Sequence, residues 1–301
     1  MSILLTGANG FIGKQITHIN NDVVTVSTVH KKADFYIDDL DDTVNWVPIL
    51  DGVEKVIHLA NLAHADFSED EYQRINIDGS LHLVREAIKA GVKRFVYLSS
   101  VSVYGNQYEH INHSLAYQPL TKASKSKVKF EEELIKLTQS SQMEVVIVRA
   151  PLVYGPNAPG NFGLLIKLVS TTPVLPFGLI NNKRDFISVY NLSELLLTCA
   201  NHPDAGGHIF LVSDTEPVSI KDFTTAIAKG LGKKTIQLPV PVFLMRLVGS
   251  LINKSTMVEQ LVGDLQVDSS CVREVLNWTP PYTMEESMAS LLIMTNEKRN
   301  K

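Results

Sequence analysis

The chain has 301 residues, of which 45% are hydrophobic and 20% charged, and its formal net charge is -4. This length and composition predict a soluble globular protein with a large core, built as one big domain or as a domain with a smaller lobe. The mild negative charge, without a basic block, argues against nucleic acid as the main partner. Cys199 and Cys271 are far apart and lack metal-ligand spacing, so we expect buried free thiols of a reducing compartment and no metal site.

The sequence also bears on localisation. The chain does not start with a basic segment followed by an apolar run, which predicts that it carries no signal peptide. The most apolar late stretch, 240–252, contains Arg246 and is too short to span a bilayer. We therefore expect a cytoplasmic protein without a membrane partner.

A glycine-rich stretch at 6–13 organises the first half of the chain. It follows the apolar run Ile3 to Leu5, which indicates a short buried strand, and it leads into an amphipathic segment from Phe11 onward. Glycines at 7, 10 and 13 permit a tight turn, a close approach to a pyrophosphate and close packing of helix on sheet. The helix then offers free N–H groups and the positive end of its dipole, which predicts a nucleotide-binding site.

Strands and helices alternate after this loop, which predicts an α/β fold with a doubly wound parallel sheet. The further strands are expected at 23–26, at a short segment that ends with 38–40, and at 55–60, 94–100, 144–148 and 208–212. The expected helices cover 71–90, 121–138, 192–200 and 219–229.

The end of the second strand usually sets the cofactor preference. An acidic residue there would hold the adenosine ribose and repel a 2′-phosphate. This place holds Ser27 and Thr28, followed by a histidine and two lysines at 30–32. A hydroxyl group with cations nearby favours NADP, and a solvated basic turn is the alternative interpretation. A carboxylate of Asp38 or Asp39 could accept a hydrogen bond from adenine, although a polar turn explains both nearly as well.

Three polar residues near the next strands are of interest. His58 lies inside an apolar strand and is more consistent with a buried core histidine than with a catalyst. Asn76 lies on the following helix and could bond across the sheet. Ser100 stands at the carboxyl end of the strand at 94–100, where ligands bind in open parallel sheets.

The composition changes beyond Pro151, where Pro and Gly become frequent. This is typical of a loop-rich lobe that shapes a ligand site. We expect a dinucleotide-binding domain at 1–160, to which the chain returns near 184–212. A smaller C-terminal α/β lobe at 161–301 would mainly bind the substrate.

The chain resembles the extended short-chain dehydrogenases/reductases, the NAD-dependent epimerase/dehydratase family, over nearly its whole length. The motifs that carry the resemblance are 6–13, 56–60, Asn76, 97–105, Ser126-Lys127, 149–156, 184–187 and 276–280. The segments at 161–162 and 182–185 look most like bacterial enzymes of surface-polysaccharide sugar synthesis. That group includes UDP-N-acetylhexosamine 4-epimerases and reductases that form UDP-N-acetylquinovosamine.

The resemblance implies a Rossmann-type domain, NAD or NADP as cofactor and a UDP-sugar as substrate. Ser100 matches the residue that hydrogen-bonds the reacting sugar oxygen, Lys127 the lysine that holds the nicotinamide ribose, and Arg184 the arginine that grips the diphosphate. Asn161 is implied as a further substrate contact. The implied cofactor contacts are Gly7, Asn9, Gly10, Phe11, Ile12, Gly13, Ser27, Asp39, Leu40, Leu59, Ala60 and Lys127.

One departure from the family pattern concerns the chemistry. The family's Tyr-x-x-Ser-Lys motif aligns with the segment from Ala123 to Lys127, so an alanine replaces the catalytic tyrosine. Positions 123 and 127 share one face of a helix. Alanine cannot transfer a proton, and general acid–base catalysis typically contributes about a hundred- to ten-thousand-fold. The substitutes that remain open are Tyr104, Tyr117, His110 and His113.

Two functions are compatible with these residues. The first is an NAD(P)-dependent nucleotide-sugar epimerase or reductase that acts at sugar C4, and the second is a protein that binds the same ligands without turnover. Ala123 favours the second, whereas Ser100, Lys127 and Arg184 favour the first, which we prefer. The resemblance also implies a homodimer through a four-helix bundle of the helices at 71–90 and 121–138.

Overall fold

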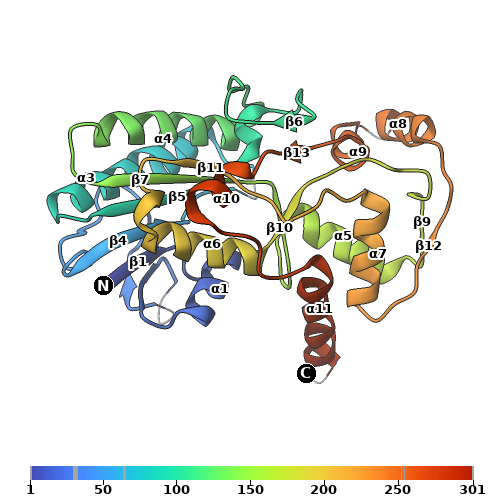
Figure 1. The fold of residues 1–301 in the computed structure, drawn as a ribbon, viewed down its shortest axis with the longest axis horizontal. Coiled ribbons are helices and arrows are strands. Elements are labelled where there is room, and N and C mark those ends of the chain that lie inside the picture. The colour runs from blue at the N-terminus through green and yellow to red at the C-terminus, as the bar shows by residue number, and fades with distance from the viewer. Residues whose placement is uncertain (1, 30–32, 64–65, 252, 254, 300–301) are drawn as a thin grey trace.

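The computed structural model describes residues 2–29, 33–63, 66–251, 253 and 255–299. Two lobes lie side by side (Figure 1). The first is a parallel sheet with helices on both faces, and the second is mainly helical.

Seven strands form the central sheet in the order β11-β7-β5-β4-β1-β2-β3, and every neighbouring pair is parallel. They are β1 (Ser2–Thr6), β2 (Val23–Ser27), β3 (Phe35–Tyr36), β4 (Val53–His58), β5 (Arg94–Ser100), β7 (Glu144–Ala150) and β11 (Ile209–Leu211). The chain leaves β1 toward β3 and then crosses back to β4 on its other side. This confirms the doubly wound prediction, and ligands of such folds bind where the strand order reverses, which here is at the carboxyl ends of β1 and β4.

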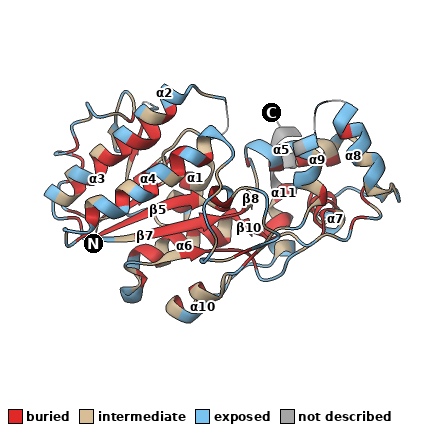
Figure 2. Ribbon diagram, turned by 90° about the horizontal axis from the view of Figure 1, so that it is seen from above, coloured by how far each residue is buried: buried red, intermediate tan, exposed pale blue. Residues whose placement is uncertain are grey.

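Two helical layers cover the sheet. One contains α1 (Phe11–Ile19), α6 (Val189–Asn201) and α10 (Ser270–Leu276), which pack on one apolar face. The other contains α2 (Glu69–Glu71), a π-helix (Tyr72–Gly79), α3 (Ser80–Lys89) and α4 (Lys122–Thr138). The strands are therefore buried between the layers (Figure 2).

Some predicted bounds differ from the structure. The single helix expected at 71–90 is divided by the π-helix, where Gly79 packs so closely that a Cβ would lie 2.3 Å from the carbonyl oxygen of Leu40. The strand expected at 55–60 ends at His58, because the next two N–H groups bond to the Thr6 side chain. The strand expected to end at 38–40 stops at Tyr36.

The second lobe consists of α5 (Gly160–Thr171), α7 (Ile220–Gly230), α8 (Val242–Leu251), α9 (Ser255–Val262) and α11 (Met284–Arg299), with the strand pair β9 (Val174–Leu175) and β12 (Ile236–Gln237). Its core is rich in aromatic side chains, and the rings of Phe186 and Phe223 stack at 3.9 Å between centroids. The parallel pair β8 (Leu152–Tyr154) and β10 (Phe186–Ser188) joins the lobes, and β6 (His110–Ile111) pairs with β13 (Gln266–Val267). The domain boundary at 160 stays a prediction.

The described residues lack membrane-spanning helices and metal-ligand groups, and their cysteines are free thiols. None of their helices is long and apolar enough to cross a membrane. Nor do they contain a group of three or more His, Cys, Asp or Glu residues that could hold a metal ion. The predicted burial of the free thiols is confirmed for Cys199 and wrong for Cys271, which is partly exposed on the outer helix α10.

Candidate functional site

The glycine turn after β1 is closely packed. Gly7 has a φ of +70°, and a Cβ there would lie 2.9 Å from the nitrogen of Ala60. A Cβ on Gly13 would lie 2.2 Å from the oxygen of Gly7, so the packing requires glycine at both positions. The N-cap of α1 is Gly10, which supplies no side-chain cap, and the first turn has no acidic residue. The first N–H groups of α1 therefore lack side-chain acceptors, as a diphosphate site requires.

A buried hydrogen-bond chain fixes the loop after β4. The hydroxyl oxygen of Thr6 accepts from the backbone N–H groups of Leu59 at 3.1 Å and Ala60 at 3.2 Å. Its own proton therefore goes to Nδ1 of His58 at 2.8 Å, and Nε2–H of His58 donates to Ser80 at 3.0 Å. Burial lowers the pKa of His58 to about 3, so the ring is neutral. His58 is the expected core histidine, and it positions two predicted cofactor contacts.

The end of β2 is tied to the glycine turn. Asn9 donates from Nδ2 to the hydroxyl oxygen of Ser27 at 2.5 Å, and the N–H of Val29 donates to the same oxygen at 3.0 Å. Because this oxygen accepts twice, the hydroxyl proton of Ser27 is available to a ligand. The basic residues at 30–32, on which the NADP preference also rests, lie outside the described residues.

The carboxylate of Asp39, the predicted adenine contact, already has partners within the chain. Asp39 forms an ion pair with Arg74 at 2.7 Å and accepts from the N–H of Leu40 at 2.9 Å. Its role toward adenine stays a prediction. Among the described residues, Asn76 does not bond across the sheet: it accepts from the N–H of Leu62 at 2.7 Å and donates to Ser126 at 3.0 Å, which joins the loop after β4 to α4.

The predicted catalytic positions lie at the end of β5 and on the first two turns of α4. Ser100 ends β5, and its hydroxyl oxygen accepts from the N–H of Ser102 at 3.1 Å. A capping box between Thr121 and Ser124 starts α4, so Ala123 and Lys127 face the same side. Ser124 is engaged in this cap.

Lys127 is the most unusual side chain of the site. It is only 8% exposed, and no hydrogen bond or ion pair joins its ammonium group to the described residues, although Nζ is not among the fully enclosed polar atoms that lack a partner. The ring of Tyr97 lies beside it, 5.7 Å from Nζ to the ring centroid. Burial lowers the pKa of Lys127 to about 8, although the nearby charge of Glu131 opposes the shift. A largely buried cation without a counter-ion is costly, which makes Lys127 a candidate ligand contact.

A buried arginine holds both tyrosines that could replace the missing acid. The guanidinium of Arg149, at the end of β7, is 2.5 Å from the carboxylate of Glu131 on α4. It also donates to the hydroxyl oxygens of Tyr104 and Tyr117, each at 2.5 Å. Both phenol oxygens are thereby held at the guanidinium of Arg149. From the sequence, Arg149 was predicted only as part of the motif at 149–156. Its position at the end of a buried strand could have indicated the cluster, because a buried arginine needs a buried partner.

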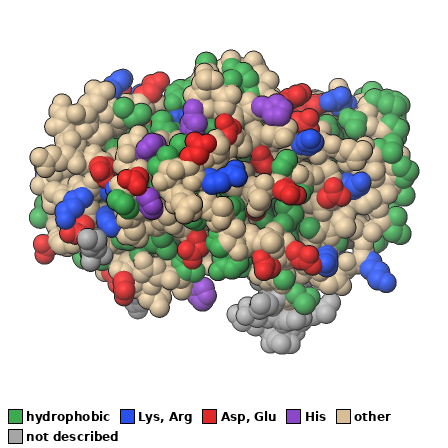
Figure 3. Space-filling model, in the orientation of Figure 1, with side chains coloured by type: hydrophobic (Ala, Val, Ile, Leu, Met, Phe, Trp, Pro, Cys, Tyr) green, Lys and Arg blue, Asp and Glu red, His purple; other side chains and the backbone are tan. Residues whose placement is uncertain are grey.

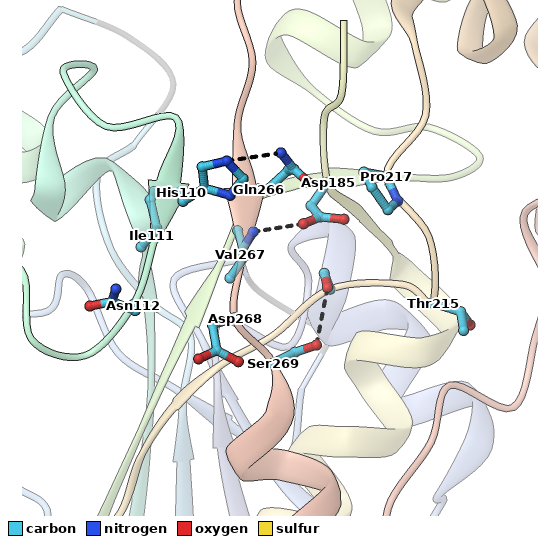
Figure 4. Close-up of a pocket in the computed structure, with 11 residues that line it drawn as sticks. His110, Ile111, Asn112, Asp185, Thr215, Pro217, Gln266, Val267, Asp268 and Ser269 are labelled. Atoms are coloured by element: carbon cyan, nitrogen blue, oxygen red, sulfur yellow. Dashed lines mark hydrogen bonds between the residues drawn. The ribbon is translucent and has the colours of Figure 1, made fainter.

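The two histidines that could replace the acid also lie elsewhere. Burial lowers the pKa of His113, and the charge of Arg149 lowers it further. His110 lies 3.4 Å from Gln266, ring Nε2 to amide nitrogen, in a separate cavity (Figure 4).

This cavity has a volume of about 320 Å³ and is mainly polar. Its lining residues are His110, Ile111, Asn112, Asp185, Ser213, Thr215, Pro217, Gln266, Val267, Asp268 and Ser269. Asp185 accepts from the N–H of Val267 at 2.6 Å, and burial raises the pKa of this carboxyl to about 6. None of the predicted catalytic or cofactor residues lines it.

The predicted substrate residues both contact the segment at 260–263. Asn161 donates to Gln260 at 3.3 Å, and Arg184 donates from Nη1 to the carbonyl oxygen of Gly263 at 2.8 Å. Burial lowers the pKa of Arg184. The predicted cofactor contact Phe11 packs against the core of the second lobe, so the glycine turn and the second lobe are in contact.

The fold and the site define a class of protein. A doubly wound sheet, a glycine turn into an uncapped helix and a buried lysine on the helix that follows β5 identify an extended short-chain dehydrogenase/reductase. The sequence pattern described as "NAD dependent epimerase/dehydratase family" matches residues 3–213, and the chain belongs to this family of enzymes.

Known proteins similar to this chain agree with that assignment. A UDP-glucose 4-epimerase of Vibrio cholerae is 38% identical over 95% of this chain and 92% of its own length. An N-acetyl-alpha-D-glucosaminyl-diphospho-ditrans,octacis-undecaprenol 4-epimerase of Escherichia coli O157:H7 is 24% identical over 95% of this chain and 93% of its own length. The structure of a UDP-glucuronic acid 4-epimerase from Bacillus cereus in complex with NAD superposes with a TM-score of 0.78 at 19% identity, covering 99% of both chains.

Proposed function

We propose that the protein is a cytoplasmic, NAD(P)-dependent nucleotide-sugar epimerase or reductase that acts at C4 of a UDP-sugar, in the UDP-hexosamine class of surface-polysaccharide synthesis. The observation that carries the proposal is Lys127, a buried ammonium group without a partner in the described chain, one helical turn from Ala123. Such a group is expected where a cofactor hydroxyl and a reacting oxygen meet.

The residues of the first lobe fit a dinucleotide. The uncapped start of α1, with Gly10 at its N-cap, would hold the diphosphate, and Lys127 would hold the nicotinamide ribose. Ser27 has a free hydroxyl proton and carries no charge, so it would tolerate the 2′-phosphate of NADP. When bound, the cofactor accepts a hydride from the sugar carbon or delivers one to it.

The proton transfer needs another group, because Ala123 takes the place of the family's tyrosine. Tyr104 and Tyr117 are bound to Arg149, and His110 lies in the separate cavity. We assign the transfer to Lys127. A neutral amine accepts the proton of the C4 hydroxyl as the hydride leaves the carbon, and the ammonium returns it when a hydride comes back. Over one epimerisation, the proton and the hydride taken from the sugar are therefore both returned to it.

Other residues would position the substrate. The hydroxyl of Ser100 would donate to the sugar oxygen at C4, since it ends β5 at the carboxyl edge of the sheet. Arg184 donates from Nη1 to Gly263, and its other N–H groups would bind the substrate diphosphate. Asn161, which reaches the same segment, would contact the nucleotide side of the substrate.

The test is turnover of UDP-N-acetylgalactosamine with NAD⁺ or NADP⁺, followed by chromatography for UDP-N-acetylglucosamine, and oxidation of NADPH by a 4-keto UDP-sugar. An epimerase converts the first and a reductase consumes the second. Binding of both ligands without turnover would instead identify a binding protein. Ser100→Ala should lower the rate while cofactor binding, read from nicotinamide fluorescence, is unchanged.

A second candidate substrate is a sugar carried on a polyprenyl diphosphate, the kind named for the Escherichia coli relative. The observation that favours it is an exposed apolar face of α8 on the substrate lobe. Chromatography of lipid-linked N-acetylglucosamine after incubation with the protein would distinguish the two substrates.

The homodimer through α3 and α4 also remains a proposal. Lys129 on α4 already bonds to Gln73 of the same chain at 2.8 Å. Light scattering of the purified protein would decide between a monomer and a dimer.

A further inference from the structure

The helix α8 in the second lobe is apolar on both sides. Its inner side, with Val242 and Met245, packs on the core of the lobe, and Gly249 is buried. Its outer side consists of Phe243, Leu244, Leu247, Val248 and Leu251, all exposed. The exposed fraction reaches 67% for Phe243 and 75% for Leu251. We call these five residues the α8 face.

The α8 face is a continuous stripe and not scattered exposure. At the helical spacing its five side chains fall within roughly 140° of arc. A surface helix normally turns polar residues to solvent, and contiguous apolar surface on a soluble protein marks an interaction site. The α8 face is therefore a surface that lacks a partner within the described chain.

The apolar surface continues onto the neighbouring strands. Leu238, Leu179 and Ile236 are exposed at the same end of the lobe, where the N–H of Gly178 donates to the carbonyl oxygen of Leu238. Hydrophobic side chains gather along this end of the molecule, over α8, β9 and β12 (Figure 3). The surface is thus broader than one helix.

The segment at 233–262, which includes α8, has a net positive charge, opposite in sign to the net charge of the whole chain. Residues 233–262 contain four basic residues, Lys233, Lys234, Arg246 and Lys254, and one acidic residue, Glu259, whereas the chain carries a net charge of -4. Glu259 is paired with Arg246 at 2.8 Å, so the lysines carry the remaining positive charge. Lys233 and Lys234 are exposed.

We propose that this end of the second lobe docks on an anionic lipid surface, with α8 lying in the plane of the membrane and the α8 face among the headgroups. Leucine, valine and phenylalanine on one side with lysines beside them are typical of helices that lie on membranes. Lysine is depleted at protein–protein interfaces, which makes a second copy a poorer match. The helix lies on the surface and does not cross it, since ten residues cannot span a bilayer.

Membrane docking stands apart from the proposed activity, because none of the residues of the α8 face belongs to the cofactor or catalytic positions. A variant without turnover should still dock on the membrane, and a variant that does not dock should still turn over a water-soluble UDP-sugar. It revises the sequence prediction that the protein has no membrane partner.

The experiment is co-sedimentation of the full chain with vesicles of phosphatidylcholine, with and without phosphatidylglycerol. Binding should be strong only with phosphatidylglycerol and should weaken as salt is raised. The variant Leu247→Gln with Leu251→Gln should lower the partition coefficient by about tenfold or more. Lys233→Gln with Lys234→Gln should reduce binding to the anionic vesicles only.

The matched control is Val47→Gln, which changes an equally exposed apolar residue (69% exposed) on the first lobe and should bind like the unaltered chain. Circular dichroism should show all variants folded, because the changed side chains are exposed. Failure of the unaltered chain to sediment with anionic vesicles would overturn the proposal. So would equal binding by the leucine variant, or a dimer in light scattering that this variant dissociates.

Discussion

Arg149 and Glu131 form an ion pair at 2.5 Å in which the side chains are 2% and 1% exposed. Glu131 lies one helical turn after Lys127 on α4, yet its carboxylate is used by the arginine. Lys127 is thereby left as a buried cation without a counter-ion in the described chain. Burial lowers the pKa of Lys127 and the charge of Glu131 opposes this only in part, while the same arginine donates to Tyr104 and Tyr117.

Glu131→Gln should destabilise the protein strongly, because it leaves the guanidinium of Arg149 buried without its counter-charge. We expect a loss of about 3–5 kcal/mol in the free energy of unfolding, measured by urea titration. Glu133→Gln on the same helix is the control, since that carboxylate is in an exposed pair with Lys136 and should matter little. Similar small losses in both variants would contradict the structural role of the buried pair.

Two glycines of the turn should behave differently. Gly13→Ala places a methyl group 2.2 Å from the oxygen of Gly7 and should destabilise the fold, whereas the corresponding distance at Gly10 is 3.1 Å. Gly10→Ala should therefore keep most of the melting temperature but weaken cofactor binding, because the methyl group occupies the space before α1. Thermal melts and fluorescence titration with NADPH separate the effects. An unchanged cofactor affinity in Gly10→Ala would rule out this place for the diphosphate.

Asp185 should make stability depend on pH. Its pKa is raised by burial to about 6 in the folded protein, so the folded state holds the proton more tightly than the unfolded state. The stabilisation is present below the unfolded pKa near 4 and is lost as pH rises through about 6. Asp185→Asn should remove this fall while it keeps an acceptor for the N–H of Val267. Parallel melting curves of both proteins across this range would refute the assignment.

Restoring the family's tyrosine should raise the rate. The capping box fixes the start of α4, so a tyrosine at 123 would share a face with Lys127. We expect Ala123→Tyr to increase kcat/KM toward the lower end of the range of about a hundred- to ten-thousand-fold, because Lys127 already supplies part of the proton transfer. Initial rates with UDP-N-acetylgalactosamine measure this, with Ser124→Ala as a control on the helix cap. A rate unchanged by the tyrosine would mean that proton transfer does not limit turnover.

Local patterns made much of the fold predictable from the sequence. The glycine turn, the alternation of strands and helices and the start of α4 depend on neighbouring residues, so the bounds of β5, which ends at Ser100, and of α4, which carries Ala123 and Lys127, could be predicted to within one residue. The NADP preference and the adenine contact stay predictions, because they need a ligand and the basic residues at 30–32.

Other features required three-dimensional contacts. Arg149, Glu131 and Tyr117 come from a strand, a helix and a loop that are distant in sequence, so their cluster could not be predicted. The π-helix at 72–79 keeps the apolar periodicity of an α-helix closely enough to be mistaken for one. The α8 face could not be predicted either, because apolar residues give the same sequence pattern whether they are buried or exposed.

The central claim is that Lys127 carries the proton, and the pH dependence of kcat/KM in the unaltered protein and in Lys127→Arg tests it most directly. Arginine keeps the charge and can bond to a ribose, but it does not release its proton. At saturating cofactor the unaltered protein should gain about tenfold in kcat/KM per pH unit below about 8 and level off above it. Lys127→Arg should bind cofactor yet lose about a hundredfold or more in rate, without that pH dependence. An arginine variant with the original rate and pH profile would contradict the assignment.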